Sequence, residues 1–465
     1  MRKTKIICTM GPSTDKGDVM ERLVREGMDV ARFNFSHGPH DEQRGRIQKL
    51  RELRKKYDRP VAALLDTKGP EIRLGCFKDG KVFLEEGQIF TFTNKDIEGT
   101  NECVSITYKE LYKDVQPGGH ILVDDGLVDL EVQDIAGKDI VCKVINAGVI
   151  GDRKGVNVPG ANLKMPFISK KDHDDLLFGI QEGFDFVAAS FTRTANDIRE
   201  VRKILKENGG EEIQNQQGVD NIDEIIEAAD GIMIARGDMG VEIPPEYVPV
   251  IQQKIIQKVY TAGKPVITAT QMLDSMISHP RPTRAEATDV ANAIFQGTSA
   301  TMLSGETAAG KYPVQALQMM SRIAEHMEQN IDYNTIFKKT DRNENPDITN
   351  AIAHATCLTA IDLKASAILA VTKSGSTAHM MSKHRPGCLI GACTSSERVL
   401  RQLNLSWGVY PMLIKEEYSS EILCLRAIEA AQKHKLVKVG DTIVFAGGVP
   451  LGIPGTNLIR VCTVE

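Results

Sequence analysis

Three short apolar segments near the start of the chain decide its fold: KTKIICT (3–9), DVARFNF (29–35) and VAALLDT (61–67). The stretches between them are long enough for a helix and amphipathic. Short apolar strands that alternate with amphipathic helices are typical of βαβ units and a parallel sheet. The N-terminal part of the chain therefore predicts an α/β fold.

Four further apolar segments continue the alternation: FDFVAASF (184–191), GIMIARGD (231–238), PVITATQ (265–271) and SATMLSGE (299–306). One junction breaks it, because a helix at 194–210 is followed by EEIQNQQGVDN (211–221) and then by another helix, with no apolar strand between them. Right-handed crossovers require a strand to return between two helices. Seven strands with one vacancy predict an eight-stranded barrel whose fifth strand is absent.

An insertion and a C-terminal unit complete the predicted architecture. Residues 71–165 alternate in polarity and carry glycine-rich turns, as an antiparallel β module would, and they follow the third strand on the face where barrel active sites lie. The polar run KKTDRNENPD (338–347) predicts a linker. We expect a (β/α)8 TIM barrel at 1–70 and 166–337, a β-rich lid at 71–165, and a C-terminal three-layer α/β domain at 338–465.

Composition and charge exclude several classes of protein. Hydrophobic residues make up 42% and charged residues 26% of the 465 residues, which is ordinary for a globular protein. A net charge of -5 argues against nucleic acid or an anionic membrane as a partner, and no stretch approaches the roughly 20 apolar residues of a membrane span. Nine cysteines without C-x-x-C spacing indicate free thiols in a reducing compartment, so we expect a cytoplasmic protein.

Polar residues gather where the predicted barrel strands end, and a lone residue of this kind is more often a helix cap or part of a solvated loop. Four such strand ends together favour an active site. Arginine and lysine beside hydroxyl, amide and carboxylate oxygens suit a phosphate held with hard cations, which stabilises a transferring phosphoryl group or an enolate. Phosphoryl transfer fits best. The candidates at these ends are Arg32, Asn34, Ser36, His37, Asp66, Thr67, Lys68, Arg73, Arg236, Gly237, Asp238, Thr270 and Gln271.

Several longer motifs occur in order over essentially the whole chain: VARFNFSHG, LLDTKGPEIR, KGVNVPG, MIARGDMGVEIP, KPVITATQMLDSM, RPTRAEATDVANAIFQGTSATMLSGETAAGKYP and TKSGSTA. Together they resemble the pyruvate kinase family, and ATQMLDSM with RPTRAE is the most specific part of the match. The resemblance implies a barrel interrupted by a mobile lid, a C-terminal domain and a homotetramer. It also implies a glycolytic reaction in which the phosphoryl group of phosphoenolpyruvate passes to ADP, giving pyruvate and ATP.

The resemblance assigns roles residue by residue. Arg32 would anchor phosphate, with Arg236 also catalytic, and Thr270 would lie near the enolate carbon. Gly237 and Asp238 would take the substrate carboxylate and Mg²⁺ or Mn²⁺. The K⁺ ligands would be Asn34, Ser36, Asp66 and Thr67. The nucleotide contacts would be Arg73, Lys154 and His37.

The family pattern also has a strand that ends in a lysine and, two residues on, a glutamate, just before the Asn-x-x-Gly-Val found here at 215–219. In this chain Gln214 is joined directly to Asn215. The lysine would stabilise the phosphoryl group and the glutamate would be the second carboxylate on Mg²⁺. Either these residues are omitted from the sequence as it stands or the deletion is real. Barrel closure favours an omission, and a real deletion predicts little or no kinase activity.

A second anion site is predicted where a strand turns into a helix in the C-terminal domain. Backbone N–H groups at a helix start bind anions, although an ordinary N-cap is an equally good interpretation of the residues alone. The resemblance implies a pocket for a phosphorylated allosteric effector, closed by the glycine-rich stretch 447–455. The residues concerned are Thr372, Lys373, Ser374, Gly375, Ser376 and Thr377.

Two other functions remain open from the residues. A Mg²⁺-dependent barrel lyase could hold an enolate at the same ARGD segment, although the lid, the proposed K⁺ cluster and the C-terminal domain argue against it. The second is a phosphate-sensing protein without catalytic activity, which a real loss of the lysine and glutamate would support.

Overall fold

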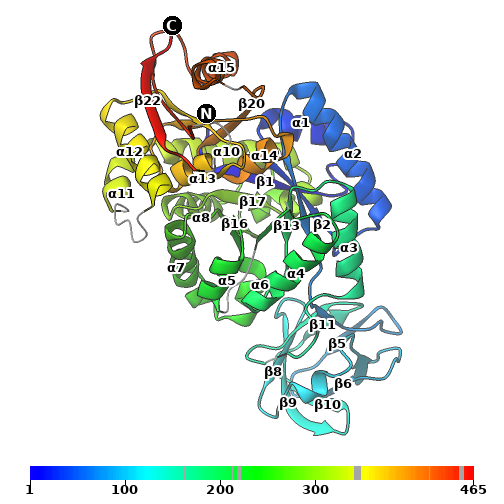
Figure 1. Ribbon diagram of the computed structural model, residues 1–465. Coiled ribbons are helices and arrows are strands. Elements are labelled where there is room, and N and C mark those ends of the chain that lie inside the picture. Colours follow the sequence, from blue (N-terminus) through cyan, green and yellow to red (C-terminus); the bar gives the residue numbers. More distant parts are fainter. Residues whose placement is uncertain (162, 212, 217–220, 340–346, 418, 450–454) are drawn as a thin grey trace.

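The computed structural model describes residues 1–161, 163–211, 213–216, 221–339, 347–417, 419–449 and 455–465. The barrel lies in the middle of the molecule, the β-rich insertion projects from one end of it, and the C-terminal unit covers the other end (Figure 1). The predicted linker falls largely on 340–346, which lie outside the described residues.

Eight parallel strands form the barrel sheet, in the order β14-β13-β3-β2-β1-β17-β16-β15. Alternate side chains point inward and fill the interior, among them Ile7, Leu64, Phe186 and Met233, while the others pack against the surrounding helices. This alternation makes the barrel a packed core. The strands are β1 Lys5–Met10, β2 Val30–Asn34, β3 Ala62–Asp66, β13 Phe186–Ala188, β14 Gln214–Gln216, β15 Ile232–Ala235, β16 Val266–Ala269 and β17 Ala300–Leu303.

The prediction of a vacant fifth position is wrong, because β14 occupies it. Gln214 and Gln216 pair in parallel with Phe186 and Ala188 of β13. The strand escaped detection because it is short and polar, whereas backbone pairing requires no apolar side chain. Among the described residues β14 and β15 stand at the two ends of the sheet, so the barrel is nearly closed and not sealed by a hydrogen-bonded ladder.

Helices surround the barrel and several begin with reciprocal caps. The first turns of α3, α4 and α8 each carry a capping box, made by Ser169 with Asp172 in the case of α3. The helices of this layer are α1 Val19–Glu26, α2 His40–Tyr57, α3 Lys170–Gln181, α4 Ala195–Glu207, α5 Ile222–Ala228, α6 Arg236–Glu242, α7 Val248–Thr261, α8 Arg284–Phe295, α9 Gly305–Ala308 and α10 Pro313–Gln329.

The insertion between β3 and α3 has its own hydrophobic core and a seven-stranded sheet in the order β4-β12-β8-β9-β10-β6-β7, with a separate β5-β11 pair. The expected antiparallel pairing holds except between β6 and β7, which run parallel. The strands are β4 Ile72–Arg73, β5 Lys81–Leu84, β6 Ile89–Thr93, β7 Cys103–Ser105, β8 His120–Val123, β9 Val128–Ala136, β10 Asp139–Val144, β11 Gly148–Gly151 and β12 Gly155–Asn157.

The C-terminal unit is the expected three-layer α/β sandwich, with sheet order β20-β19-β18-β21-β22. Alternate residues of β18 face two separate cores: Ile368 and Ala370 pack with α12 and α13, and Ala367 and Leu369 pack with α15. The strands are β18 Ala367–Val371, β19 Leu389–Thr394, β20 Val409–Leu413, β21 Thr442–Gly447 and β22 Leu458–Thr463. The helices are α11 Tyr333–Lys339, α12 Ile348–Asp362, α13 Ser376–Lys383, α14 Glu397–Gln402 and α15 Ser420–Lys433.

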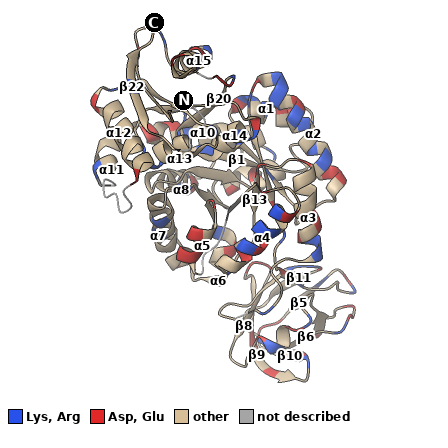
Figure 2. Ribbon diagram, in the orientation of Figure 1, with Lys and Arg blue, Asp and Glu red and all other residues tan. Residues whose placement is uncertain are grey.

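The surface agrees with the balanced charge of the chain. Acidic and basic residues are interspersed over the outer helices of the barrel, without a large field of one sign in this view (Figure 2). Within the described ranges, none of the helices combines the length and apolar character needed to cross a bilayer.

Candidate active site between barrel and lid

The ends of β2 and β3 bring four of the predicted site residues together. Asn34 and Asp66 are register partners in the sheet, and Phe35 N donates to Asp66 O at 2.9 Å. Ser36 N donates to Asn34 Oδ1 at 2.9 Å, and Ser190 N donates to Thr67 Oγ1 at 3.2 Å. The cluster offers carboxylate, amide and hydroxyl oxygens, which suit a hard monovalent cation such as K⁺.

Arg32 lies beside this cluster and is held rigidly. Its Nε donates to Asp66 Oδ2 at 2.7 Å and its Nη1 donates to Thr9 Oγ1 at 3.1 Å. The other oxygen of Asp66 accepts a 2.5 Å hydrogen bond from Ser190 Oγ. Arg32 is therefore a preorganised positive charge near the predicted cation ligands.

The ends of β15 and β16 supply the opposite side of the site. The predicted strand at 231–238 ends earlier than expected, since Arg236, Gly237 and Asp238 form the first turn of α6. Gly237 N donates to Thr270 Oγ1 at 2.7 Å. Thr270 has φ of 67° and Gln271 has φ of 51°, values that are strained for residues with a Cβ and most of all for a β-branched one.

Arg236 is engaged in holding this strained turn. Its Nη1 donates to Asp289 Oδ2 at 2.6 Å and its Nη2 donates to Thr270 O at 2.7 Å. Glu306 supports the same region, since its carboxylate accepts from Leu273 N at 3.0 Å and Ser304 N at 2.7 Å, while burial raises its pKa. The backbone around Thr270 is thus fixed from two directions.

Asp238 is the carboxylate predicted to hold a divalent ion. In the described part of the chain no three histidine, cysteine, aspartate or glutamate side chains converge as a metal-binding group. The second carboxylate expected from the family pattern is missing from the sequence at this point. The residues present therefore do not complete the predicted divalent site.

A cavity of about 430 Å³ separates the barrel end from the lid. Its wall includes Asp238 from the barrel and Glu71, Asp125 and Gly155 from the lid. It also includes Phe191 and Arg193, which sequence reasoning missed because they follow β13 in an ordinary-looking loop. The positive φ of 58° at Phe191 marks this loop as strained, and a backbone angle of this kind leaves no signal in the sequence.

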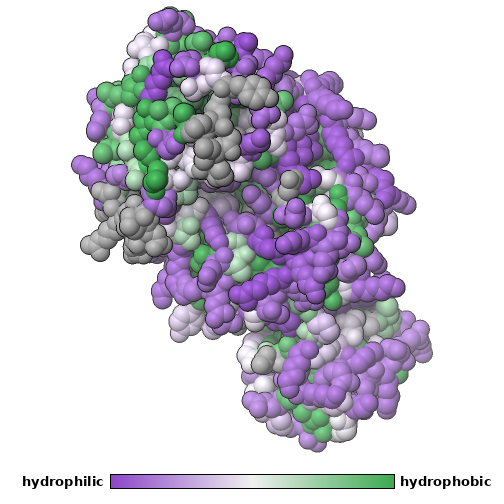
Figure 3. Space-filling model, in the orientation of Figure 1, coloured by the Kyte–Doolittle hydropathy of each residue, from purple (hydrophilic) through white to green (hydrophobic). Residues whose placement is uncertain are grey.

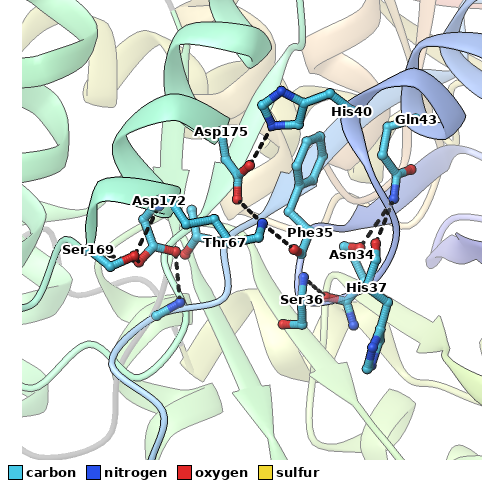
Figure 4. Close-up of polar contacts among 12 residues, drawn as sticks. Asn34, Phe35, Ser36, His37, His40, Gln43, Thr67, Ser169, Asp172 and Asp175 are labelled. Atoms are coloured by element: carbon cyan, nitrogen blue, oxygen red, sulfur yellow. Dashed lines mark hydrogen bonds and ion pairs between the residues drawn. The ribbon is translucent and has the colours of Figure 1, made fainter. Parts of the chain in front are cut away.

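The predicted nucleotide contacts lie at the base of the lid or beside it. Arg73 is the register partner of Gly155, the first residue of β12, and Leu74 N donates to Lys154 O at 2.9 Å. Arg73 pairs with Glu71 at 2.6 Å and Lys154 with Asp124 at 2.9 Å. His37 is exposed in the turn after β2 (Figure 4). Arg73 and Lys154 therefore lie on adjacent segments of the lid, each paired with an acidic residue, while His37 belongs to the barrel.

The C-terminal unit has a separate pocket of about 360 Å³ at the start of α13. Five of the six predicted effector residues line it, Gly375 being the exception. Gly375 has φ of 91° and its N–H donates to Thr372 Oγ1 at 2.9 Å, which shapes the turn. Gly447, Gly448, Val449 and Gly455 also line the pocket, whereas 450–454 of the predicted closing stretch lie outside the described residues.

A barrel with cation-ligand oxygens, a fixed arginine and a lid-covered cavity at its strand ends defines an enzyme that handles phosphorylated substrates. Comparison with known proteins is consistent with this class. The family model "Pyruvate kinase, barrel domain" matches residues 1–317, and "Pyruvate kinase, alpha/beta domain" matches 350–462. The chain belongs to the pyruvate kinase family.

Similar proteins cover the whole chain. A pyruvate kinase of Sporosarcina psychrophila is 50% identical over 99% of this chain and 80% of its own length. One from Clostridium acetobutylicum is 49% identical, with both chains covered completely. A crystal structure of a pyruvate kinase from Cryptosporidium parvum superposes with a TM-score of 0.95 at 39% identity, covering 100% of this chain and 96% of that one. The predicted fold, family and glycolytic phosphotransferase function are confirmed, and the lyase alternative is not favoured.

Proposed function

We propose that phosphoenolpyruvate and ADP bind in the cavity between the barrel and the lid. Arg32 faces the substrate phosphate as a fixed cation, Gly237 and Thr270 hold the enolate end, and Arg73, Lys154 and His37 meet the nucleotide phosphates. The observation that carries the proposal is this cavity, whose wall combines Asp238 of the barrel with Glu71, Asp125 and Gly155 of the lid. Arg32 and Thr270 do not line it, but each is held by hydrogen bonds at a barrel strand end. Phosphate groups are recognised by such preorganised positive charge.

Two cations belong to the proposed site. The oxygens of Asn34, Ser36, Asp66 and Thr67 fit K⁺, which when bound supplies a further fixed positive charge near the phosphate. Mg²⁺ or Mn²⁺ is proposed at Asp238, which is a single carboxylate and therefore a weak site by itself.

The junction at Gln214 and Asn215 decides whether this chain turns over. The match to the Clostridium acetobutylicum enzyme spans 473 positions, whereas this chain has 465 residues, so at least eight positions have no residue here. We propose that most of them fall at this junction. A chain that truly lacks these residues should give little or no ATP from phosphoenolpyruvate and ADP, because the lysine and glutamate are missing, whereas an omission from the sequence alone leaves the activity of the family intact.

The test inserts, between Gln214 and Asn215, a segment that ends in a lysine and, two residues on, a glutamate, so that this segment replaces β14 as the fifth strand of the barrel. Pyruvate formation is measured by coupling to lactate dehydrogenase. We expect the insertion to raise turnover by at least ~10³-fold, since removing preorganised charge at a reacting phosphoryl group typically costs that much. A matched insertion with methionine and glutamine in place of lysine and glutamate supplies the same segment without its charges, and should stay inactive. Normal turnover by the chain without any insertion would refute the proposal.

The remaining features are proposals as well. The pocket at Thr372–Thr377 is proposed to bind a phosphorylated allosteric effector, supported by its hydroxyls, Lys373 and the start of α13. A homotetramer is supported by exposed apolar side chains of the C-terminal unit, Ile348 and Leu358 of α12 and Val461 of the edge strand β22. Figure 3 shows hydrophobic residues on the surface of the same unit. The proposed location is the cytoplasm. The proposed domains are the barrel at 1–70 and 166–337, the lid at 71–165 and the C-terminal domain at 338–465.

A further inference from the structure

The first two turns of α3 contact both loops that carry the proposed K⁺ ligands. Figure 4 shows α3 side chains directed toward the turn after β2 and toward the segment after β3. The helix begins where the chain returns from the lid to the barrel. None of its residues was among the predicted site residues.

Lys171 and Asp175 hold the turn after β2. Lys171 Nζ donates to Phe35 O at 2.7 Å, and Phe35 lies between the two proposed ligands Asn34 and Ser36. The same ammonium pairs with Asp175 Oδ2 at 2.6 Å. Since the Asp175 side chain is only 1% exposed, its carboxylate gives Lys171 a fixed counter-charge.

His40 completes this contact from the start of α2. Its Nε2 lies 2.6 Å from Asp175 Oδ1, and its ring stacks on Phe178 of α3 at a centroid distance of 4.5 Å. Gln43, one turn further along α2, donates from Nε2 to Asn34 O at 3.3 Å and to His37 O at 3.2 Å. The turn is therefore held from α2 and α3 together.

Asp172 holds the second loop from the same helix. It is fully buried, caps α3 with Ser169, and accepts from Gly69 N at 3.0 Å through its Oδ1. Gly69 lies two residues beyond the proposed ligand Thr67. One short helical segment thus sets the spacing between the two pairs of ligand residues.

We propose that Lys171 and Asp175 are positioning residues for the monovalent cation, which set its affinity and selectivity by fixing the Phe35 carbonyl. A protein selects a large, weakly hydrated ion through the positions of its oxygen ligands. The hydrogen bond from Lys171 to Phe35 O fixes the backbone between the ligands Asn34 and Ser36, so it acts directly on selectivity. The inference rests on the proposed K⁺ site.

The test compares Lys171→Met with Lys170→Met, a change in the neighbouring exposed lysine. Binding of Tl⁺ is measured by thallium NMR, with competition by K⁺ and by Na⁺ at constant ionic strength. We expect Lys171→Met to weaken K⁺ binding by at least ~10-fold and to reduce the K⁺ over Na⁺ preference, as loss of a group that orients metal ligands typically does. Lys170→Met should behave as the parent chain, and Lys171→Arg, which keeps a cationic donor, should restore most of the preference.

Two further measurements test the positioning role. Asp175→Asn removes the counter-charge of Lys171 and keeps the shape of the side chain, so it should also reduce the preference for K⁺ over Na⁺, and it serves as the test if Lys171→Met does not fold. Unchanged K⁺ affinity and selectivity in a folded Lys171→Met chain would overturn the positioning role. Absence of any K⁺ competition in the parent chain would overturn the cation site itself and this inference with it.

Discussion

At the scale of single residues, Asp185 shows how a buried charge joins distant parts of the chain. Its side chain is 0% exposed and lies just before β13. Arg401 Nε of α14 pairs with Oδ1 at 2.8 Å, Arg54 Nη2 of α2 lies 3.4 Å from Oδ2, and Ala63 N donates to Oδ2 at 2.9 Å. Two guanidinium groups from different elements therefore depend on one carboxylate.

We expect Asp185→Asn to lower the free energy of unfolding by ~3 kcal/mol, because two partly buried arginines lose their counter-charge. Urea unfolding monitored by circular dichroism measures the change. The control is Asp96→Asn, since Asp96 is 93% exposed and its ion pair with Lys109 should contribute less than ~0.5 kcal/mol. Equal effects of the two substitutions would contradict this role for Asp185.

At the scale of elements, two helical glycines with opposite surroundings test how tightly the layers pack. Gly179 of α3 faces β3, and a Cβ added there would lie 2.6 Å from Leu65 Cδ1. Gly45 of α2 has no atom within 4 Å of an added Cβ. Close packing of α3 on β3 is what brings Lys171 and Asp172 to the two ligand loops.

We predict that Gly179→Ala destabilises the protein by ~1–3 kcal/mol, because overpacking forces the helix away from the strand. Gly45→Ala should stabilise it by ~0.5–1 kcal/mol, since alanine loses less backbone entropy in a helix. Thermal unfolding midpoints should therefore move in opposite directions. A stabilising Gly179→Ala would show that α3 is free to shift.

At the scale of the whole molecule, the C-terminal unit docks on the barrel through an interface that is partly polar. Arg385 Nη2 donates to Gly297 O at 2.8 Å and its guanidinium lies over the Trp407 ring at 4.3 Å. His379 of α13 is partly buried at the same interface, with Nδ1 2.8 Å from Ser406 Oγ. Burial lowers the pKa of His379 to about 4.

This lowered pKa predicts that stability falls with acidification. The histidine has a pKa near 6.5 in the unfolded chain and about 4 in the folded chain. Between these two values the unfolded chain binds a proton that the folded chain does not, so the free energy of unfolding decreases as the pH falls from 6.5 toward 4. We expect a loss of ~2 kcal/mol over this range that is absent in His379→Gln. Unfolding midpoints of both chains between pH 4 and 7.5 measure it, because the other titrating groups are shared. Parallel curves would refute the assignment.

Much of the fold and part of the site followed from the amino-acid sequence alone. Periodic apolar segments report burial, so seven barrel strands, the β-rich insertion and the C-terminal sandwich were predictable. Strand ends also indicated Arg32, Asn34, Asp66 and Thr270, because parallel strands present their carboxyl ends on one face of a barrel. The motifs then identified the family and revealed the missing lysine and glutamate.

Only the tertiary structure decided the rest. β14 is polar and forms because the edge of β13 offers hydrogen bonds, which no periodicity records. Lys171 meets Phe35 O across 136 residues of sequence, and Arg401 meets Asp185 across 216. Apolar patterns in the sequence determine which face of each element is buried. Polar contacts between distant residues exist only after the elements have packed. The contact of Lys171 with Phe35 O and the docking of the C-terminal unit on the barrel are therefore properties of the folded molecule.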